Sequence, residues 1–342
     1  MLVFSIFSNI EYSGKNFKTL FAQYKNIFSF DFIKMIYEIY RFYKLCKKTK
    51  LHNIDNNMTI TDFLNMHNFS MYFRNLHINP LISSIWSTNQ IDAGNFPFHL
   101  FINFFRNHDL FSLKNRPQWK FVKGGSNSYI KKILDHKKFH YTLNSKISKV
   151  IRSNNQIKII ENKEERSFDY LVMATHADQV LKILDKPTEL EKNILSIFEY
   201  TNNKAYLHSD SKMMPKDKKT WSSWNFIKNK KNNHAFTLTY WMNNLQKLKS
   251  NSDYFVTINP DKIPKLIHDE TSFKHPKFNL LTSKYQKSLK NLQGINNTFF
   301  CGAYHGFGFH EDGIQSAAYV ANMLDVDIPW KRDKTFYNRL QY

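Results

Sequence analysis

The stretch FFCGAYHGFGFHEDGIQSAAYVANML, Phe299 to Leu324, is the part of the sequence from which the fold is predicted. The short apolar run Thr298 to Cys301 is typical of a strand, and a glycine-rich turn then leads to a predicted helix over Ile314 to Leu324. Four of the nine glycines in the chain fall in this stretch: Gly302, Gly306, Gly308 and Gly313. Small residues in the helix would let it pack closely on a sheet or a ligand: Ser316, Ala317, Ala318 and Ala321.

The start of this predicted helix has two interpretations. Backbone N–H groups at a helix start attract negative charge, so they could bind the anionic or carbonyl oxygens of a ligand. The same glycines could form a tight turn without a ligand, and residue chemistry leaves both open. The segment Gly306-Phe307-Gly308 begins like a dinucleotide fingerprint, but Glu311 stands at the third glycine position. The preceding strand and the spacing are also wrong, so we reject that motif.

Earlier in the sequence, the predicted secondary structure changes after Pro117 from mainly helices to mainly strands. Apolar spacing predicts helices over Asp31 to Lys48, Thr61 to Phe73, Ile78 to Trp86 and Phe96 to Phe105. A hairpin is predicted from Lys146 to Arg152 and Gln156 to Glu161 around Asn154-Asn155, and a buried strand over Phe168 to Thr175. The alternating stretches KAYLHS, TWSSWNF, HAFTLTYW and YFVTI between Asn203 and Ile258 predict a mainly antiparallel sheet.

Composition limits the classes of protein that need to be considered. The formal net charge is +21 and 42% of the residues are hydrophobic, so the chain should fold. Because the lysines are spread along the chain, we expect no nucleic-acid partner and at most a weak surface contact with an acidic membrane. The two cysteines, Cys46 and Cys301, form neither a disulfide framework nor a metal pattern. Met1 to Ser8 does not read as a signal peptide and no run is long enough for a membrane span. We expect a cytoplasmic protein, peripheral at most to the inner face of the membrane.

Eight stretches distributed over nearly the whole chain match one known pattern. They are EYSG (Glu11 to Gly14), LFAQ (Leu20 to Gln23), IWST (Ile85 to Thr88), FFRNHDLFSL (Phe104 to Leu113), RPQWKFVKGGSNSYI (Arg116 to Ile130), ATHADQVLKIL (Ala174 to Leu184), TYWMNNLQ (Thr239 to Gln246) and FCGAYHGFGFHEDG (Phe300 to Gly313). With them the chain resembles a bacterial group described as predicted NAD/FAD-binding proteins, in the flavin-containing amine oxidase superfamily of FAD-dependent oxidoreductases.

The resemblance implies a mixed α/β fold in which a discontinuous FAD-binding domain interleaves with a substrate domain of helices and a mainly antiparallel sheet. Residues 1–115 would form the helical part of the substrate domain and residues 186–293 its antiparallel sheet. Residues 116–185 and 294–330 would belong to the FAD domain, and residues 331–342 would form a tail.

The resemblance also implies a set of residues that contact a noncovalent FAD. Ile147 would lie in the strand whose backbone contacts adenine. Ala174 and Thr175 would end a strand near the phosphates, and Gly302 would lie close to the pyrophosphate and ribityl chain. The remaining expected contacts are the pair Gly124 and Gly125 and, at the flavin ring, Gly313, Ile314 and Gln315.

One part of the family pattern is absent from this sequence. Relatives begin with a strand, G-x-G-x-x-G and a helix, followed by an acidic residue that holds the adenosine ribose. The resemblance therefore predicts an incomplete FAD domain that binds FAD poorly by itself. Two alternatives stay open: a non-catalytic remnant or half of a split flavoprotein, and a basic peripheral membrane-binding protein.

The catalytic residues and the substrate are less well defined. His305 and His310 are candidate proton carriers because imidazole titrates near neutrality, although a hydrogen bond that stabilises the turn explains either one equally well. Tyr304 could line a substrate slot or simply pack in the core. We expect no metal site, since His136 and His140 have no further ligands beside them. Because relatives are often encoded beside fatty-acid-modifying enzymes, the resemblance favours a small-molecule or lipid acyl substrate. It leaves the oligomeric state open.

Overall fold

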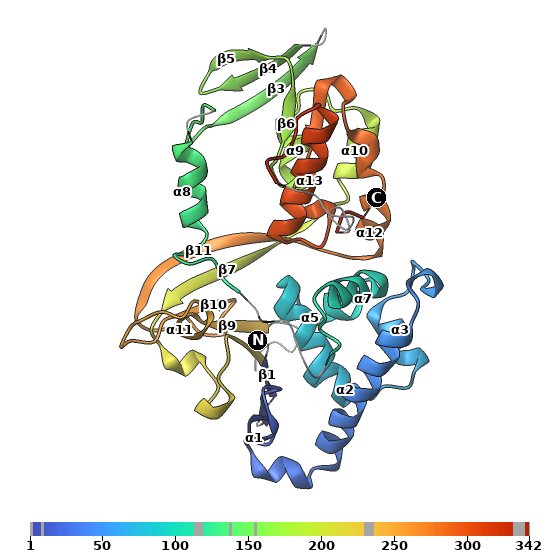
Figure 1. Ribbon diagram of the computed structural model, residues 1–342, viewed down its shortest axis with the longest axis vertical. Helices are drawn as coiled ribbons and strands as arrows, with labels where there is room; N and C mark the ends of the chain where they lie inside the picture. Colours follow the sequence, from blue (N-terminus) through green and yellow to red (C-terminus); the bar gives the residue numbers. More distant parts are fainter. Residues whose placement is uncertain are drawn as a thin grey trace. The chain divides into compact units, whose positions relative to one another are not determined.

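The computed structural model describes residues 3–7, 10–112, 118, 120–136, 139–153, 156–228, 236–330 and 339–341. The chain forms two compact units, and each contains two separate stretches of sequence (Figure 1). Unit 1 comprises residues 1–136 and 201–275, and unit 2 comprises residues 137–200 and 276–342. The division into FAD and substrate domains at residues 115, 185, 293 and 330 stays a prediction.

The helices of unit 1 contain many of its aromatic side chains. Its helices and short helical turns are α1 (Phe17–Leu20), η1 (Tyr24–Phe28), α2 (Phe30–Lys48), η2 (Leu51–Asn53), α3 (Ile60–Met66), α4 (Met71–Phe73), η3 (Arg74–Ile78), α5 (Asn79–Trp86), α6 (Gln90–Gly94), α7 (Phe98–Asn107) and α8 (Asn127–Asp135). The ring of Phe42 in α2 lies 5.7–5.9 Å, between centroids, from the rings of Phe63, Phe69, Phe73 and Phe101. Ring-on-ring packing of this kind places many of the 31 phenylalanines in the core.

The second part of unit 1 is a sheet whose described strands run in the order β11-β7-β10-β9-β8-β1-β2. These elements are β1 (Val3–Phe7), β2 (Ile10–Tyr12), β7 (Tyr200–His208), β8 (Trp224–Lys228), β9 (Phe236–Trp241), β10 (Phe255–Ile258) and β11 (Ile267–Pro276), with η4 (Ser211–Met213), η5 (Lys218–Thr220) and α11 (Met242–Leu245) between them. Strands β7 to β10 pair antiparallel, as predicted, whereas β1 joins β8 in parallel. β11, at one edge, was not predicted.

Hydrogen bonds from a buried histidine connect three neighbouring strands of this sheet, β7, β10 and β9. The Asp210 N–H donates to His208 Nδ1 at 3.0 Å, so the neutral ring carries its proton on Nε2. Nε2 then donates to the Thr257 hydroxyl at 2.7 Å, which lies 2.9 Å from the Thr239 hydroxyl, and Thr239 donates to the Met213 carbonyl. Burial lowers the pKa of His208 to about 4, so the network holds an uncharged ring at neutral pH.

Unit 2 contains two small sheets and the helices that cover them. Its elements are β3 (Ile147–Ser153), β4 (Gln156–Glu161), β5 (Glu164–Phe168), β6 (Leu171–Met173), α9 (Ala177–Ile183), α10 (Glu189–Leu195), α12 (Leu280–Gln286), η6 (Leu289–Leu292), η7 (Ile295–Asn297), β12 (Thr298–Phe300), η8 (Ala303–His305) and α13 (His310–Met323). The predicted hairpin is confirmed, because β3 pairs antiparallel with β4, and β4 pairs with β5. β6 and β12 form a separate parallel pair. The whole is the mixed α/β fold that the sequence predicts.

A buried ion pair ties the two sheets of unit 2 to a helix. The Arg152 guanidinium donates to both carboxylate oxygens of Glu191, at 2.5 and 2.8 Å, and the two side chains are 4% and 0% exposed. Arg152 also reaches Thr298 in β12 at 3.5 Å. Burial alone would raise the pKa of Glu191, but Arg152 and the N–H of Thr188 outweigh it and hold that pKa below its usual range.

Candidate functional site

The carboxyl ends of β6 and β12 bring together residues that are far apart in sequence. The two strands pair from Thr298 with Leu171 to Phe300 with Met173, so Ala174-Thr175 and Gly302-Ala303 follow at the same edge. A Cβ added to Gly302 would lie 3.8 Å from the Thr175 carbonyl oxygen. Ala174 and Thr175 are exposed and Gly302 is half-buried. Ligands of parallel α/β sheets bind beyond the carboxyl ends of the strands, and this edge is such a place.

Gly302 stands at a position where any other residue would be strained. Its φ of +150° is one that side-chain-bearing residues rarely adopt, and an added Cβ would come within 2.8 Å of the Tyr304 ring. The Gly302 N–H donates to the Ser316 hydroxyl at 2.9 Å, and that hydroxyl in turn lies 2.8 Å from the Gly313 carbonyl oxygen. The Ser316 hydroxyl therefore connects the end of β12 to α13 through hydrogen bonds. The sequence predicted only that Ser316 is small enough for close packing.

The last helix begins earlier than predicted and carries its own negative charge. α13 starts at His310, not at Ile314, because the Asp312 carboxylate accepts the Phe309 N–H at 2.7 Å and so caps the helix start from within its first turn. Gly313 is thus the fourth residue of the helix, and its N–H already donates to the Phe309 carbonyl at 3.2 Å. Because Glu311 and Asp312 occupy the first turn, this helix start does not suit a phosphate.

Gly313 nevertheless leaves room beside the strand ends. Outside its own helix and its chain neighbours, the only described heavy atom that a Cβ at Gly313 would meet within 4 Å is Ala303 N, at 4.0 Å. Ile314 is exposed, whereas Gln315 is buried. The surface formed by Thr175, Gly302-Ala303 and Gly313 therefore consists mainly of backbone and small side chains, which allow a flat ligand to approach the main chain closely.

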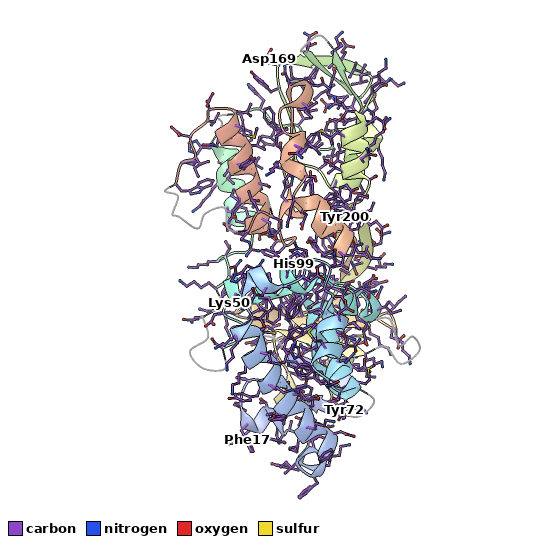
Figure 2. The ribbon with its side chains drawn as sticks, turned by 90° about the vertical axis from the view of Figure 1, so that its right-hand side faces the viewer. Phe17, Lys50, Tyr72, His99, Asp169 and Tyr200 are labelled. Carbon is purple, nitrogen blue, oxygen red and sulfur yellow. The ribbon has the colours of Figure 1, made fainter. Side chains whose placement is uncertain are left out.

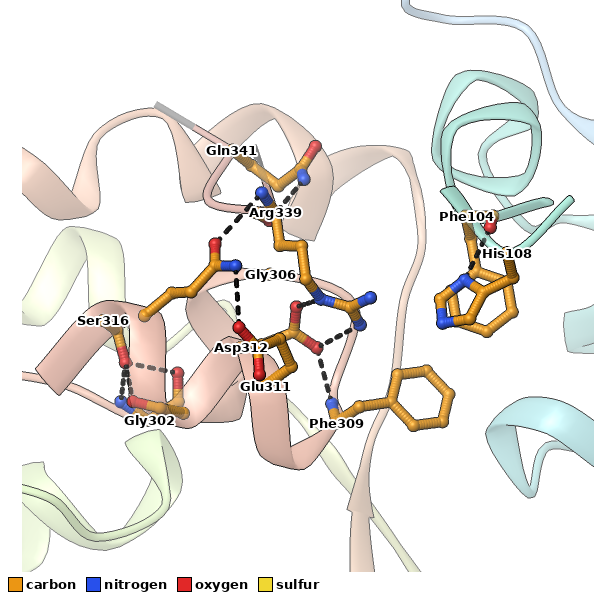
Figure 3. Close-up of polar contacts among 12 residues, drawn as sticks. Phe104, His108, Gly302, Gly306, Phe309, Glu311, Asp312, Ser316, Arg339 and Gln341 are labelled. Carbon is orange, nitrogen blue, oxygen red and sulfur yellow. Dashed lines mark hydrogen bonds and ion pairs between the residues drawn. The ribbon is translucent and has the colours of Figure 1, made fainter. Parts of the chain in front are cut away.

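The end of the chain packs against the first turns of α13 (Figure 3). The buried Arg339 guanidinium donates to Asp312 at 2.7 and 3.2 Å, and the Arg339 N–H donates to the Gln315 side chain at 3.2 Å. The Gln315 amide also donates to Glu311 at 3.0 Å. Both the amide oxygen and the amide nitrogen of Gln315 are therefore hydrogen-bonded within the protein, to Arg339 and Glu311 respectively.

The three candidate catalytic residues differ in exposure. Tyr304 and His305 are 2% and 0% exposed, and burial lowers the pKa of His305 to about 3. His305 is therefore a neutral interior ring, and the loop around it is held by Gln286, whose amide donates to the Tyr304 and Gly306 carbonyls. His310 is exposed at the start of α13. Of the three, only His310 is accessible to a ligand outside the core.

The other predicted contact residues lie in exposed or half-buried positions. Gly124 and Gly125 form a turn with φ of +80° and +76° before α8, closed by the Gly125 N–H donating to the Val122 carbonyl at 2.9 Å. Ile147 is 40% exposed at the start of β3. His136 is exposed, and no cluster of three or more metal-ligating side chains occurs among the described residues.

Comparison with known proteins identifies the family. The model of the flavin containing amine oxidoreductase family matches residues 52–242, more than half of the 342 residues. The chain belongs to the flavin-containing amine oxidoreductase family. Members of this family are flavin-dependent oxidoreductases. No curated protein sequence gives a significant match.

Solved structures share the fold at low sequence identity. A CLA-producing fatty acid isomerase from P. acnes is 13% identical with a TM-score of 0.64, over 87% of this chain and 76% of the other. Putrescine oxidase bound to putrescine is 11% identical with a TM-score of 0.58, over 92% and 78% of the two chains. Cyclohexylamine oxidase from Brevibacterium oxydans is 11% identical with a TM-score of 0.56, over 85% and 75%. These similarities establish the fold.

Proposed function

We propose that the chain is an FAD-dependent oxidoreductase in which noncovalent FAD meets the protein at the carboxyl ends of β6 and β12. The observation that carries the proposal is the open backbone surface formed by Thr175, Gly302-Ala303 and Gly313. Members of the family are flavoproteins, and a surface made mainly of backbone and small side chains suits the close approach of a flat ring. The acidic first turn of α13 does not fit a phosphate, so we place the ring toward Gly313 and the pyrophosphate toward Thr175 and Gly302, as the resemblance implies.

The cysteines support a noncovalent cofactor. Cys301 follows β12 directly, but its side chain is 4% exposed, and burial raises the pKa of its thiol to about 11. Cys46 is fully buried in α2, and burial raises its pKa as well. Neutral interior thiols are poor nucleophiles, so neither residue is placed to form a bond to the flavin.

The bound flavin would supply the redox chemistry by accepting a hydride or an electron pair from the substrate. The protein's part is to position the substrate and hold the ring. His310, which is exposed at the start of α13, is our candidate for receiving the substrate proton. For the substrate we propose a lipid acyl chain, since a fatty acid isomerase is among the solved structures with this fold.

An anaerobic reduction assay tests this function. The chain is incubated with excess FAD, and the absorbance of oxidised flavin is followed while fatty acids of different unsaturation, or primary amines such as putrescine, are added. We expect bleaching with a fatty acid. Bleaching only with amines would refute the acyl substrate, and bound flavin that no compound reduces would instead favour the non-catalytic alternative.

A further inference from the structure

The first helical elements of unit 1 expose an unusual number of aromatic side chains. Phe17 in α1 is 72% exposed, Tyr24 and Phe28 in η1 are 73% and 89% exposed, and Phe30 at the start of α2 is 79% exposed. In Figure 2, Phe17 and Tyr72 lie toward the lower end of unit 1, where α1 and the beginning of α2 are drawn. Single exposed apolar residues are ordinary, but a group of exposed aromatic side chains on three consecutive elements indicates an interaction surface.

The same surface continues along α2. Phe30, Ile33, Tyr37 and Tyr40 recur at intervals of three and four residues, so they share one face of the helix. Ile33, Tyr37 and Tyr40 are 43%, 62% and 51% exposed. A different face of α2 packs into the core through Phe32, Met35, Phe42 and Cys46. The helix is thus apolar on two faces, and the described part of the chain covers only one of them.

Polar residues of these elements are buried and fix this orientation. Asn26 in η1 is 3% exposed and donates to the Gln23 side chain, which also accepts the Glu11 N–H at 3.0 Å. Glu38 in α2 is 3% exposed and accepts hydrogen bonds from the Ser70 N–H and hydroxyl, at 2.9 and 2.5 Å. Because a rotation of α2 would break these bonds, the aromatic face is held outward by the fold.

The charges around the aromatic group are mainly positive. Between residues 13 and 40 the basic side chains are Lys15, Lys18, Lys25 and Lys34, all exposed, against a single exposed acid, Asp31. The turn η5, which packs against α1, adds the exposed Lys218 and Lys219. Lys44 Nζ lies 5.9 Å from the centroid of the Tyr40 ring. Exposed aromatic rings with lysines around them are the combination that binds the interface of an anionic lipid bilayer.

We infer that this surface, which we call the aromatic–lysine face (Phe17, Tyr24, Ile27, Phe28, Phe30 and the outer stripe of α2), docks on an anionic membrane. The rings enter the headgroup boundary while the lysines pair with lipid phosphates. No helix in the described part of the chain is long and apolar enough to cross a bilayer. The inference concerns unit 1 alone and does not depend on flavin binding or catalysis.

Vesicle co-sedimentation tests the inference on the full chain. We expect binding to phosphatidylglycerol-containing vesicles, weaker binding to phosphatidylcholine alone, and loss of binding as salt increases. The double variant Phe28→Ser/Phe30→Ser should bind at least tenfold more weakly, and Lys18→Glu/Lys25→Glu should lose its preference for anionic lipid. Since these side chains are exposed, circular dichroism should show an unchanged fold. The matched control is Phe273→Ser, an exposed phenylalanine in β11, which should bind like the natural chain.

Three results would overturn the inference. The first is binding of the Phe28→Ser/Phe30→Ser variant equal to that of the natural chain, and the second is no binding of the natural chain to anionic vesicles. The third comes from sedimentation velocity without lipid: if the natural chain dimerises and the same double variant is a monomer, the face is a self-association surface. We expect the two proteins to sediment alike.

Discussion

The substitution Gly313→Ala should stabilise the protein while weakening its flavin site. Gly313 is the fourth residue of α13, its backbone is helical, and an added Cβ would lie 4.0 Å from Ala303 N, an ordinary van der Waals distance. Glycine inside a helix costs about 0.5–1 kcal/mol relative to alanine, mainly through backbone entropy. We therefore expect the flavin-free variant to gain about 0.5–1 kcal/mol, or roughly 2 °C in Tm.

The flavin affinity should change in the opposite direction. The new methyl group occupies the open space beside Ala303 that we assign to the ring, and valine occupies more of it. We expect FAD binding to weaken in the order Gly313→Ala, then Gly313→Val, with the valine variant at least about tenfold weaker, or about 1.4 kcal/mol. Thermal unfolding without FAD and quenching of flavin fluorescence measure the two quantities separately.

Gly302→Ala is the matched control for the stability half of this prediction. Its φ of +150° and the 2.8 Å approach to the Tyr304 ring make the substitution destabilising, so the two glycines should give opposite signs. A Gly313→Ala variant that gains stability and keeps its full FAD affinity would refute the close approach of the ring to Gly313. A loss of stability would refute the helical, open environment.

Two further predictions concern the framework of each unit. Glu191→Gln, which leaves the buried Arg152 guanidinium without its charged partner, should lower the free energy of unfolding by about 3 kcal/mol in urea titrations, and a loss below about 1 kcal/mol would mean that the pair is solvated. Because the pKa of His208 is lowered to about 4 in the folded protein, the unfolded chain binds more protons than the folded one below pH ~6.5. The contribution of His208 to the free energy of unfolding should therefore be constant above that pH and should decrease by about 2–3 kcal/mol as the pH drops toward 4. His208→Gln should flatten this dependence between pH 6.5 and 4, and an unchanged slope would assign it to other groups.

The sequence predicts the elements whose local signals agree with their tertiary environment. The strand at Thr298 to Phe300 and the alternating strands β7 to β10 bury their apolar residues as their patterns indicate. The hairpin of β3 and β4 is also found at its predicted place. In each case apolar periodicity and burial coincide, so the pattern is sufficient.

The elements that the sequence did not reveal depend on distant contacts. β11 carries the polar sequence IHDETSFKHP, mostly exposed, and is a strand because it pairs with β7 at the sheet edge. The start of α13 was missed because the N-cap is Phe309, which provides no capping side chain, while Asp312 closes the cap from within the helix. Without an N-cap residue of the usual kind, the polar residues His310, Glu311 and Asp312 did not indicate where the helix begins.

In α2, periodicity identified the helix but not its buried face. Phe32, Ile33, Tyr37, Tyr40 and Tyr43 all fit helical spacing, yet only Phe32 and Tyr43 are buried. The buried Glu38 decides the orientation through its bonds to Ser70, which is 32 residues away. A long-range polar contact of this kind has no signature in local apolar periodicity.

Hydrogen–deuterium exchange with saturating FAD tests the proposed cofactor site most directly. The peptides to compare are those that carry Ala174-Thr175, Gly302-Ala303 and the first turns of α13, with β8 and β9 of unit 1 as a reference. We predict that FAD slows exchange in the first three and leaves the reference unchanged. Unchanged exchange at the ends of β6 and β12, with FAD demonstrably bound, would contradict the proposed site.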